Sequence, residues 1–177
     1  RFDFRGCGDS EGNLSELSLQ DHIEDLKRVL EFVVQDKRFD SSRIALFGRS
    51  LGGAIAMQAA AAFTKLKSIV LWASVFKGSL LFPHVQWKGF KEKDWEDFRK
   101  KMRINGQYPS VDYVQQVAHI DVSPIMEQLS SVPMLFLHGE QDKTVSPLHA
   151  REYEKSREQS TAPTKMIWVP RGDHDFS

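Results

Sequence analysis

The 177-residue sequence has one cysteine and no excess of charge of either sign. A single cysteine, Cys7, cannot form an internal disulfide, which suits a reducing compartment, so we expect a cytoplasmic location. Basic and acidic residues number 24 each, so no net charge attracts the chain to nucleic acid or to an acidic membrane surface. No apolar run approaches the length of a membrane span. We therefore expect one globular domain with neither nucleic acid nor a membrane as partner, and the composition leaves its oligomeric state open.

The familiar spacings of zinc ligands are also absent from the sequence. Histidines and carboxylates do gather in two segments, but without a His-Glu-x-x-His or His-x-His-x-Asp-His arrangement: His138, Glu140, Asp142, Asp173, His174 and Asp175. We therefore predict no metal site.

Residues 48–52, of the form Gly-x-Ser-x-Gly, are the most informative stretch that is present. An apolar run at residues 43–47 predicts a strand before them, and a run rich in Gly and Ala at 51–63 predicts a helix after them. A serine between a strand and a helix, flanked by glycines, is typical of a nucleophile elbow. A glycine-rich turn whose serine only caps the helix is the structural alternative.

An acid and a base follow predicted strands further along the chain. Asp142 comes after the apolar run at 134–138, and His174 comes after the run at 166–169. The carboxyl ends of parallel strands gather functional groups at one edge of a sheet. A serine needs an imidazole to take its proton, and the imidazole needs a carboxylate to orient it. The order Ser50, Asp142, His174 thus predicts a catalytic triad, with Glu140 as the rival acid.

Four segments together resemble the α/β-hydrolase superfamily. They are the Asp-x-Arg-Gly-x-Gly-x-Ser-x-Gly loop at 3–12, the elbow at Ser50, the His-Gly-x-x-Asp-x-x-Val segment at 138–145, and the Gly-x-His at 172–174. Feruloyl or cinnamoyl esterases and serine aminopeptidase-like hydrolases are the most similar branches. The resemblance implies an α/β-hydrolase fold with a mostly parallel sheet, helices on both faces and a small cap insertion. It also favours Asp142 over Glu140 as the triad acid.

The same resemblance implies that residues 1–177 are one partial domain. Family members have strands before the Arg-Gly-x-Gly loop, one of them followed by a loop that donates to the oxyanion hole, and a helix after the catalytic histidine. We expect the backbone N–H of Leu51 to give one oxyanion donor and a segment outside this sequence to give the second. We also expect the strand at 43–47 to leave an unpaired, aggregation-prone edge.

The other segments predict alternating strands and helices, with one irregular interruption. We expect a strand at 67–72, a helix that begins with a capping box at Ser18 and Asp21, a helix at 124–129 capped by Ser123, and a helix that begins at Pro147 after Ser146. Residues 74–122 occupy the place of the family's cap insertion. Its aromatic side chains either line an acyl pocket or pack the cap, and its basic stretch at 88–103 is expected to be a solvated helix face.

The sequence thus predicts a serine hydrolase that cleaves a small-molecule carboxylic ester through an acyl-enzyme, without a cofactor. A thioesterase or an aminopeptidase-like hydrolase is an alternative, because one triad serves all three bonds. A catalytically inert hydrolase-like module or truncated product is the alternative from another class. Cys7, between two glycines, is expected to be a packed thiol, and Arg5 to tie down its loop.

Overall fold

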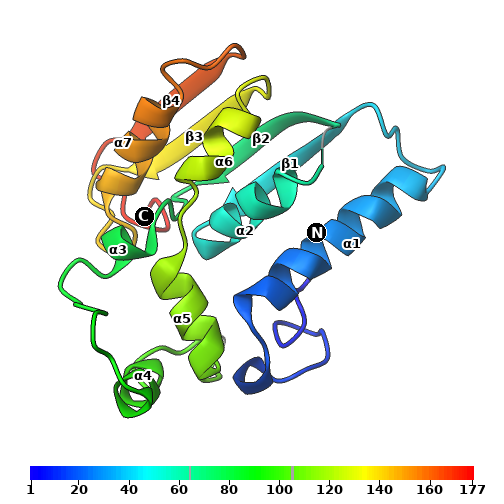
Figure 1. Cartoon of the computed structure of the whole chain (residues 1–177). Helices are drawn as coiled ribbons and strands as arrows, with labels where there is room; N and C mark the ends of the chain where they lie inside the picture. Colours follow the sequence, from blue (N-terminus) through cyan, green and yellow to red (C-terminus); the bar gives the residue numbers. More distant parts are fainter. Residues whose placement is uncertain (64, 105) are drawn as a thin grey trace.

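Four parallel strands form the sheet in the computed structural model, which describes residues 1–63, 65–104 and 106–177. They are β1 (Ile44–Arg49), β2 (Leu66–Trp72), β3 (Met134–Gly139) and β4 (Thr164–Val169), in the spatial order β1-β2-β3-β4 (Figure 1). All three strand pairs are parallel, so the carboxyl ends of all four strands lie at one edge. Each predicted strand is present, and its bounds differ from those of its apolar run by a few residues at most.

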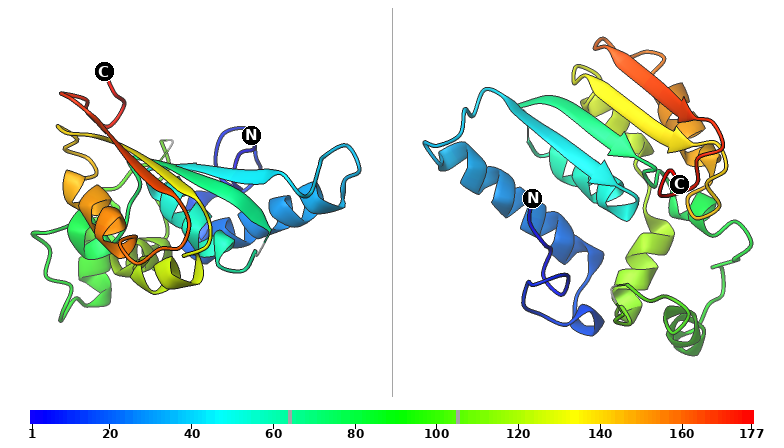
Figure 2. Two further views of the ribbon diagram at one scale, coloured as in Figure 1. Left: turned by 90° about the horizontal axis from the view of Figure 1, so that it is seen from above. Right: turned by 180° about the vertical axis from the view of Figure 1, so that it is seen from behind.

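The helices of the described chain lie on one face of this sheet (Figure 2). These helices include α2 (Leu51–Ala60), α6 (Ser123–Gln128) and α7 (Pro147–Ser156), each in a connection between successive strands. Parallel connections are nearly always right-handed, and the strand order advances in one direction, so each connection falls on the same side. The sequence analysis expected helices on both faces, whereas on β1 alternate residues are buried and exposed, as in a sheet covered on one side.

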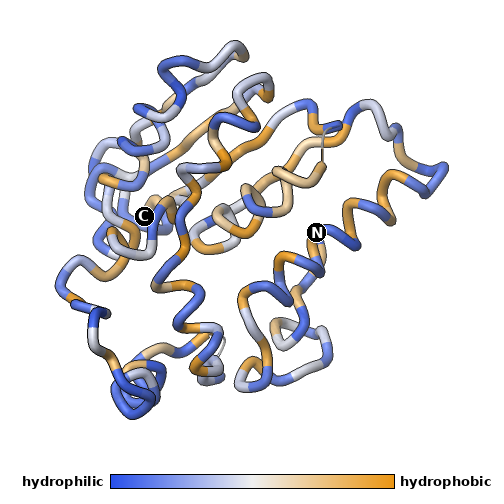
Figure 3. The backbone as a smooth tube through the Cα atoms, viewed as in Figure 1, coloured by the Kyte–Doolittle hydropathy of each residue, from blue (hydrophilic) through white to orange (hydrophobic). Residues whose placement is uncertain are grey.

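Helix α1 (Leu19–Gln35) begins where the sequence predicted. The Ser18 hydroxyl accepts the Asp21 N–H at 3.2 Å, and the Asp21 carboxylate accepts the Ser18 N–H at 2.8 Å, which completes the capping box. The apolar side of α1 packs against α2 and is visible as alternating colour along the tube in Figure 3. Arg5 donates to Asp25 at 2.7 Å and to Asp21 at 3.2 Å, so it ties the N-terminal loop to this helix as expected.

The caps of the later helices agree with the sequence in one case and differ in the other. Helix α7 begins at Pro147, with the Ser146 hydroxyl accepting the Leu148 N–H. The expectation that Ser123 caps α6 is wrong, because Ser123 is itself the first helical residue. Instead, the Asp121 carboxylate caps the start of α6, because it accepts the Ser123 N–H at 2.8 Å.

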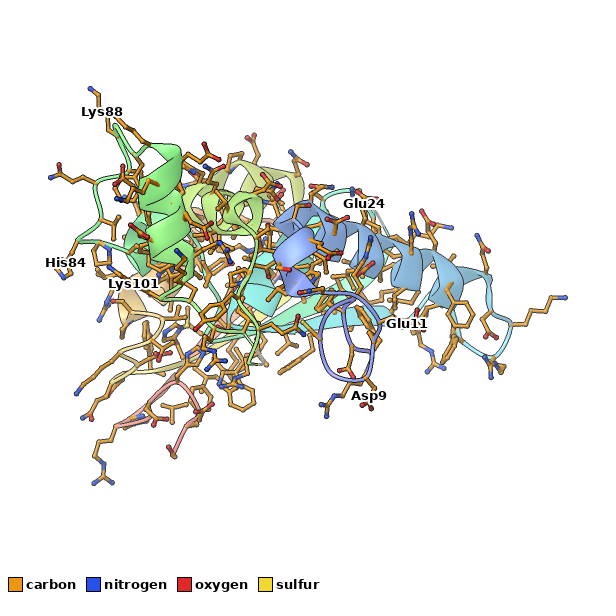
Figure 4. The ribbon with its side chains drawn as sticks, turned by 90° about the horizontal axis from the view of Figure 1, so that it is seen from below. Asp9, Glu11, Glu24, His84, Lys88 and Lys101 are labelled. Carbon is orange, nitrogen blue, oxygen red and sulfur yellow. The ribbon has the colours of Figure 1, made fainter. Side chains whose placement is uncertain are left out.

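Segment 74–122 contains α3 (Gly78–Leu81), α4 (Glu92–Arg99) and α5 (Val111–His119), which extend beyond the carboxyl ends of the strands (Figure 1). Its aromatic side chains pack on one another, as the stacking of Trp87 on Trp95 at 5.0 Å shows. Members of this cluster are Phe82, Trp87, Phe90, Trp95 and Phe98. Lys88 and Lys101 are exposed and lie on this segment, away from Glu24 on α1 and from Asp9 and Glu11 on the N-terminal loop (Figure 4). The segment therefore has an aromatic interior, and the charged side chains of α4 form a solvated face of mixed sign.

Strand β1 is an edge of the sheet and borders an apolar groove. The groove has a volume of about 530 Å³ and lies between β1 and α1, with Phe4, Leu30 and Leu46 among its lining residues. Phe47 on this strand is 61% exposed. Among the described residues, no helix combines the length and apolar character needed to cross a membrane.

Candidate active site

Ser50 occupies a strained turn between β1 and α2. Its φ of 54° and ψ of −128° lie where a residue with a side chain is rarely found, which costs about 1–3 kcal/mol. Two backbone bonds at the end of β2 hold the turn: the Ser50 N–H donates to the Trp72 carbonyl at 2.9 Å, and the Val75 N–H donates to the Ser50 carbonyl at 3.1 Å. Ser50 directly follows β1, and the end of β2 together with the residues after it fixes the backbone of the serine.

Two glycines allow the turn to close, and one of them lies outside the Gly-x-Ser-x-Gly pattern. A Cβ at Gly48 would lie 2.6 Å from the Cα of Gly53, and a Cβ at Gly53 would lie 2.2 Å from the Oγ of Ser74. A Cβ at Gly52 would meet no atom within 4 Å. Close packing therefore requires Gly48 and Gly53, whereas Gly52, the last glycine of the pattern, faces open space.

Leu51 is the first residue of α2, directly after the serine. The N–H groups of the first helical turn have no acceptor within the helix and carry its positive partial charge. The Leu51 N–H is therefore one of the donors at the start of α2 that have no acceptor within the helix.

Asp142 lies in the loop after β3 and is held by its own backbone. Its side chain is fully buried, and its Oδ1 accepts the N–H of Thr144 at 2.9 Å and the N–H of Val145 at 2.8 Å. These two bonds point Oδ2 away from the loop.

His174 lies in the loop after β4 and bonds to the free oxygen of this carboxylate. The distance from His174 Nδ1 to Asp142 Oδ2 is 2.7 Å, and the imidazole is 15% exposed. Because the carboxylate can only accept, the proton lies on Nδ1 and leaves Nε2 available as a base. The two loops are joined by a bond of 2.9 Å from the Gln141 N–H to the Gly172 carbonyl.

The loop of His174 also lies against the elbow. Arg49, the residue before Ser50, pairs with Asp175 and donates to the His174 carbonyl at 3.4 Å. Trp72, whose carbonyl binds the elbow, packs against Phe176 with ring centroids 4.8 Å apart. The structure therefore gathers the loops of the three predicted triad residues at the carboxyl edge of the sheet.

Glu140, the rival acid, takes no part in the hydrogen bond between His174 and Asp142. It is exposed, and it borders a small hollow with Pro147, Arg151 and Trp168. In the part of the chain that the structure describes, no group of three or more His, Cys, Asp or Glu side chains is placed to hold a metal ion.

A buried polar layer under the elbow was missed by the sequence analysis. His149, which belongs to no motif in the sequence, is fully buried, and its Nδ1 accepts the Phe76 N–H at 2.8 Å. Burial lowers its pKa to about 4. Tyr153 donates to the Val75 carbonyl at 2.8 Å and lies 3.0 Å from the Ser74 hydroxyl, and burial raises its pKa. No motif marks these residues, because only tertiary packing brings α7 against the segment that follows β2.

His22, which also belongs to no motif in the sequence, is buried as well. It is 2% exposed, and its ring nitrogens contact the Arg5 carbonyl at 3.0 Å and the Tyr113 hydroxyl at 3.2 Å. Burial lowers its pKa. The residue is therefore a structural link between the N-terminal loop and helix α5.

A parallel sheet with an elbow serine at its carboxyl edge defines the chain as an α/β hydrolase. The family model described as "Serine aminopeptidase, S33" matches residues 1–126, so the chain belongs to this family. Among curated proteins, WAV2 of Arabidopsis thaliana, an α/β hydrolase domain-containing protein, is 27% identical over 97% of this chain and 52% of its own length. YfhR of Escherichia coli K12 is 23% identical over 98% of this chain and 51% of its own length. The chain spans about half the length of these relatives.

Solved structures show the same fold. Est1E from Butyrivibrio proteoclasticus, in a structure with ferulic acid bound, aligns with a TM-score of 0.77 and 20% identity over 99% of this chain and 68% of that one. A bromoperoxidase from Bacillus anthracis aligns with a TM-score of 0.70 and 14% identity over 97% and 73% of the two chains. The predicted superfamily and fold class are thus confirmed, and the chain has the fold and family of a hydrolase.

Proposed function

We propose that this chain carries the catalytic site of a serine hydrolase that cleaves a carboxylic ester through an acyl-enzyme. The observation that carries the proposal is the bond between His174 and the buried Asp142, in a loop packed against the strained elbow of Ser50. This arrangement gives a hydroxyl, a base with a fixed tautomer and a carboxylate to stabilise the base when it is charged. Membership of a serine hydrolase family supports the same assignment.

Each residue has one role in the proposed reaction. The Ser50 hydroxyl attacks the carbonyl carbon while His174 Nε2 takes its proton, and the Leu51 N–H stabilises the oxyanion that forms. The C–O bond to the alcohol then breaks, and His174 returns the proton to the leaving oxygen. Water then attacks the acyl carbon while His174 Nε2 takes its proton, the C–O bond to Ser50 breaks, and His174 returns the proton to Ser50 Oγ as the carboxylic acid is released. Asp142 stays ionised and orients the imidazole throughout.

The cap is the element that we expect to select the substrate. Segment 74–122 projects beyond the carboxyl edge of the sheet, where Ser50 and His174 lie, and we infer that it forms a cap over the acyl site (Figure 1). Its aromatic residues are largely engaged with one another, which supports a packing role for most of them. The acyl preference is therefore a question for a substrate panel.

A panel of substrates distinguishes the bond that is cleaved. We would compare p-nitrophenyl esters of short and long acids, methyl ferulate, an acyl thioester and aminoacyl p-nitroanilides. Ferulate is included because Est1E binds ferulic acid, and the anilides are included because the family model names serine aminopeptidases. Preference for an anilide would replace the ester proposal with the aminopeptidase alternative.

Labelling with a fluorophosphonate tests the mechanism without knowledge of the substrate. We expect one adduct, mapped to Ser50, that is lost in Ser50→Ala and slowed at least about 100-fold in His174→Gln, because the base is gone. Ser10→Ala, which alters an exposed serine of the N-terminal loop, is the matched control and should label like the parent. A folded protein without a Ser50 adduct would refute the hydrolase mechanism and favour the inert module.

A further inference from the structure

His138, the last side chain of β3 before Gly139, lies next to the acid loop on its buried side. It is 2% exposed, and its Nε2 is 2.8 Å from the Val145 carbonyl and 3.5 Å from Asp142 Oδ2. The sequence analysis placed this histidine at the end of a strand and at the start of the His-Gly-x-x-Asp-x-x-Val segment, and considered it as a metal ligand, but gave it no role in the triad. Neither its burial nor its contacts follow from the local sequence.

Both atoms that face His138 Nε2 are acceptors. A carbonyl and a carboxylate oxygen cannot donate, so the proton of a neutral His138 must lie on Nε2. Burial lowers the pKa of His138, which keeps the ring neutral near pH 7. The ring therefore acts as a fixed donor, with its hydrogen bond to Val145 and a longer electrostatic contact to Asp142.

The bond to Val145 closes the acid loop on itself. Val145 is buried, its N–H donates to Asp142 Oδ1, and its carbonyl accepts from His138 at the start of the same loop. A loop closed in this way has one orientation for the carboxylate. The other carboxylate oxygen, Oδ2, then lies between His174 Nδ1 at 2.7 Å and His138 Nε2 at 3.5 Å.

We propose that His138 is a positioning residue of the triad, a neutral imidazole whose Nε2–H holds Val145 and faces Asp142 so that the carboxylate stays aligned with His174. This inference rests on the proposed function only for its kinetic consequences, because the alignment itself can be measured without a substrate. His138 acts through Asp142 and contacts no reacting atom.

Few other titratable or charged groups around His138 could produce the changes in kcat and in the pH profile that we expect from its substitution. Asp142 and His174 act on it electrostatically from the two loops, and His149 does so from α7. On β4, Trp168 stands opposite His138 in the register and carries Arg151 of α7 over its ring at 5.2 Å. A change in the pH profile on substitution of His138 must therefore be compared with one on substitution of His149.

The test is a matched pair of variants. His138→Phe keeps the ring and removes the N–H, whereas His138→Gln places an amide N–H near the position of Nε2. We expect His138→Phe to lower kcat about 10- to 100-fold with KM within about twofold, because a slightly displaced base loses much of its effect. His138→Gln should recover most of the loss. His84→Gln, on an exposed cap histidine, and His149→Gln are the controls.

The pH profile separates positioning from packing. In His138→Phe the Asp142 carboxylate no longer faces the Nε2–H of His138, so it should attract the His174 imidazolium more strongly. The acidic limb of the pH profile of kcat/KM should therefore move to higher pH in this variant. The limb should stay in place in His138→Gln and in His149→Gln. Equal losses in the Phe and Gln variants, or an unmoved limb in His138→Phe, would overturn the proposal.

Nuclear magnetic resonance of the wild-type protein with ¹⁵N-labelled histidine keeps the proposal testable if His138→Phe does not fold. We expect His138 as the neutral Nε2–H tautomer near pH 7, and a hydrogen-bonded Nδ1 proton on His174. The Nδ1–H tautomer of His138 would overturn the inference. If these signals are found but Ser50 does not react with a fluorophosphonate, the proposed function fails and the alignment by His138 stands.

Discussion

Asparagine in place of Asp142 changes one atom of the site, and the surrounding donors determine which one. Oδ1 accepts two backbone N–H groups, from Thr144 and Val145, so the amide oxygen of the new side chain must take that position. The amide NH₂ is then directed at His174 Nδ1, where the carboxylate stood at 2.7 Å. A donor at that position requires Nδ1 to accept, which moves the imidazole proton to Nε2.

This tautomer removes the base. His174 Nε2 carries a proton in Asp142→Asn and cannot accept one from Ser50, and the positive charge formed in the reaction loses its carboxylate. The same change of tautomer in serine proteases lowers kcat about 10⁴-fold. We expect a similar loss here, which is equivalent to about 5.5 kcal/mol of transition-state stabilisation.

The assay is hydrolysis of the best ester in the substrate panel, together with the rate of Ser50 labelling by a fluorophosphonate. Glu140→Gln is the matched control, since it makes the same change at the exposed rival acid in the same loop and should retain kcat within about twofold. Thermal melts of both variants would show that they fold. A folded Asp142→Asn protein with kcat within tenfold of wild type would refute the reasoning. A large loss of kcat in Glu140→Gln would assign the role of the triad acid to Glu140 instead.

Three further predictions concern stability and aggregation. Gly48→Ala and Gly53→Ala should each lower the free energy of unfolding by about 1–3 kcal/mol, whereas Gly52→Ala should leave it unchanged or raise it by about 0.5–1 kcal/mol; urea denaturation showing equal losses would contradict the packing. Burial lowers the pKa of His149 to about 4, so the unfolded chain binds a proton that the folded chain excludes as the pH falls from about 6.5 to 4. This difference should remove about 3 kcal/mol of stability over that range, and unfolding measured at several pH values should show a much smaller dependence in His149→Gln. Phe47→Lys should reduce concentration-dependent aggregation measured by light scattering, because it places a charge on an exposed edge strand, and unchanged aggregation would exclude this edge as the cause.

Part of the structure could be predicted from the sequence because it depends on local interactions. The strands are short apolar runs, the start of α1 is a hydrogen-bonded exchange between Ser18 and Asp21, and the turn at Ser50 is flanked by a strand and a helix. Each of these features depends on residues within a few positions of one another. The parallel sheet and the positions of the candidate triad loops could therefore be predicted.

Long-range packing decided the rest. His174 and Asp142 are 32 residues apart, and their bond exists because β3 and β4 are neighbours that end at the same edge. The requirement for Gly53 rather than Gly52 depends on Ser74, which the segment after a separate strand brings against the elbow. His138 and His149 have no distinguishing local pattern, and burial against other elements sets both their partners and the direction of their pKa changes. The sequence by itself thus determined which residue types stand at the strand ends, and the tertiary structure determined which atoms meet, because those contacts join elements that are distant in the chain.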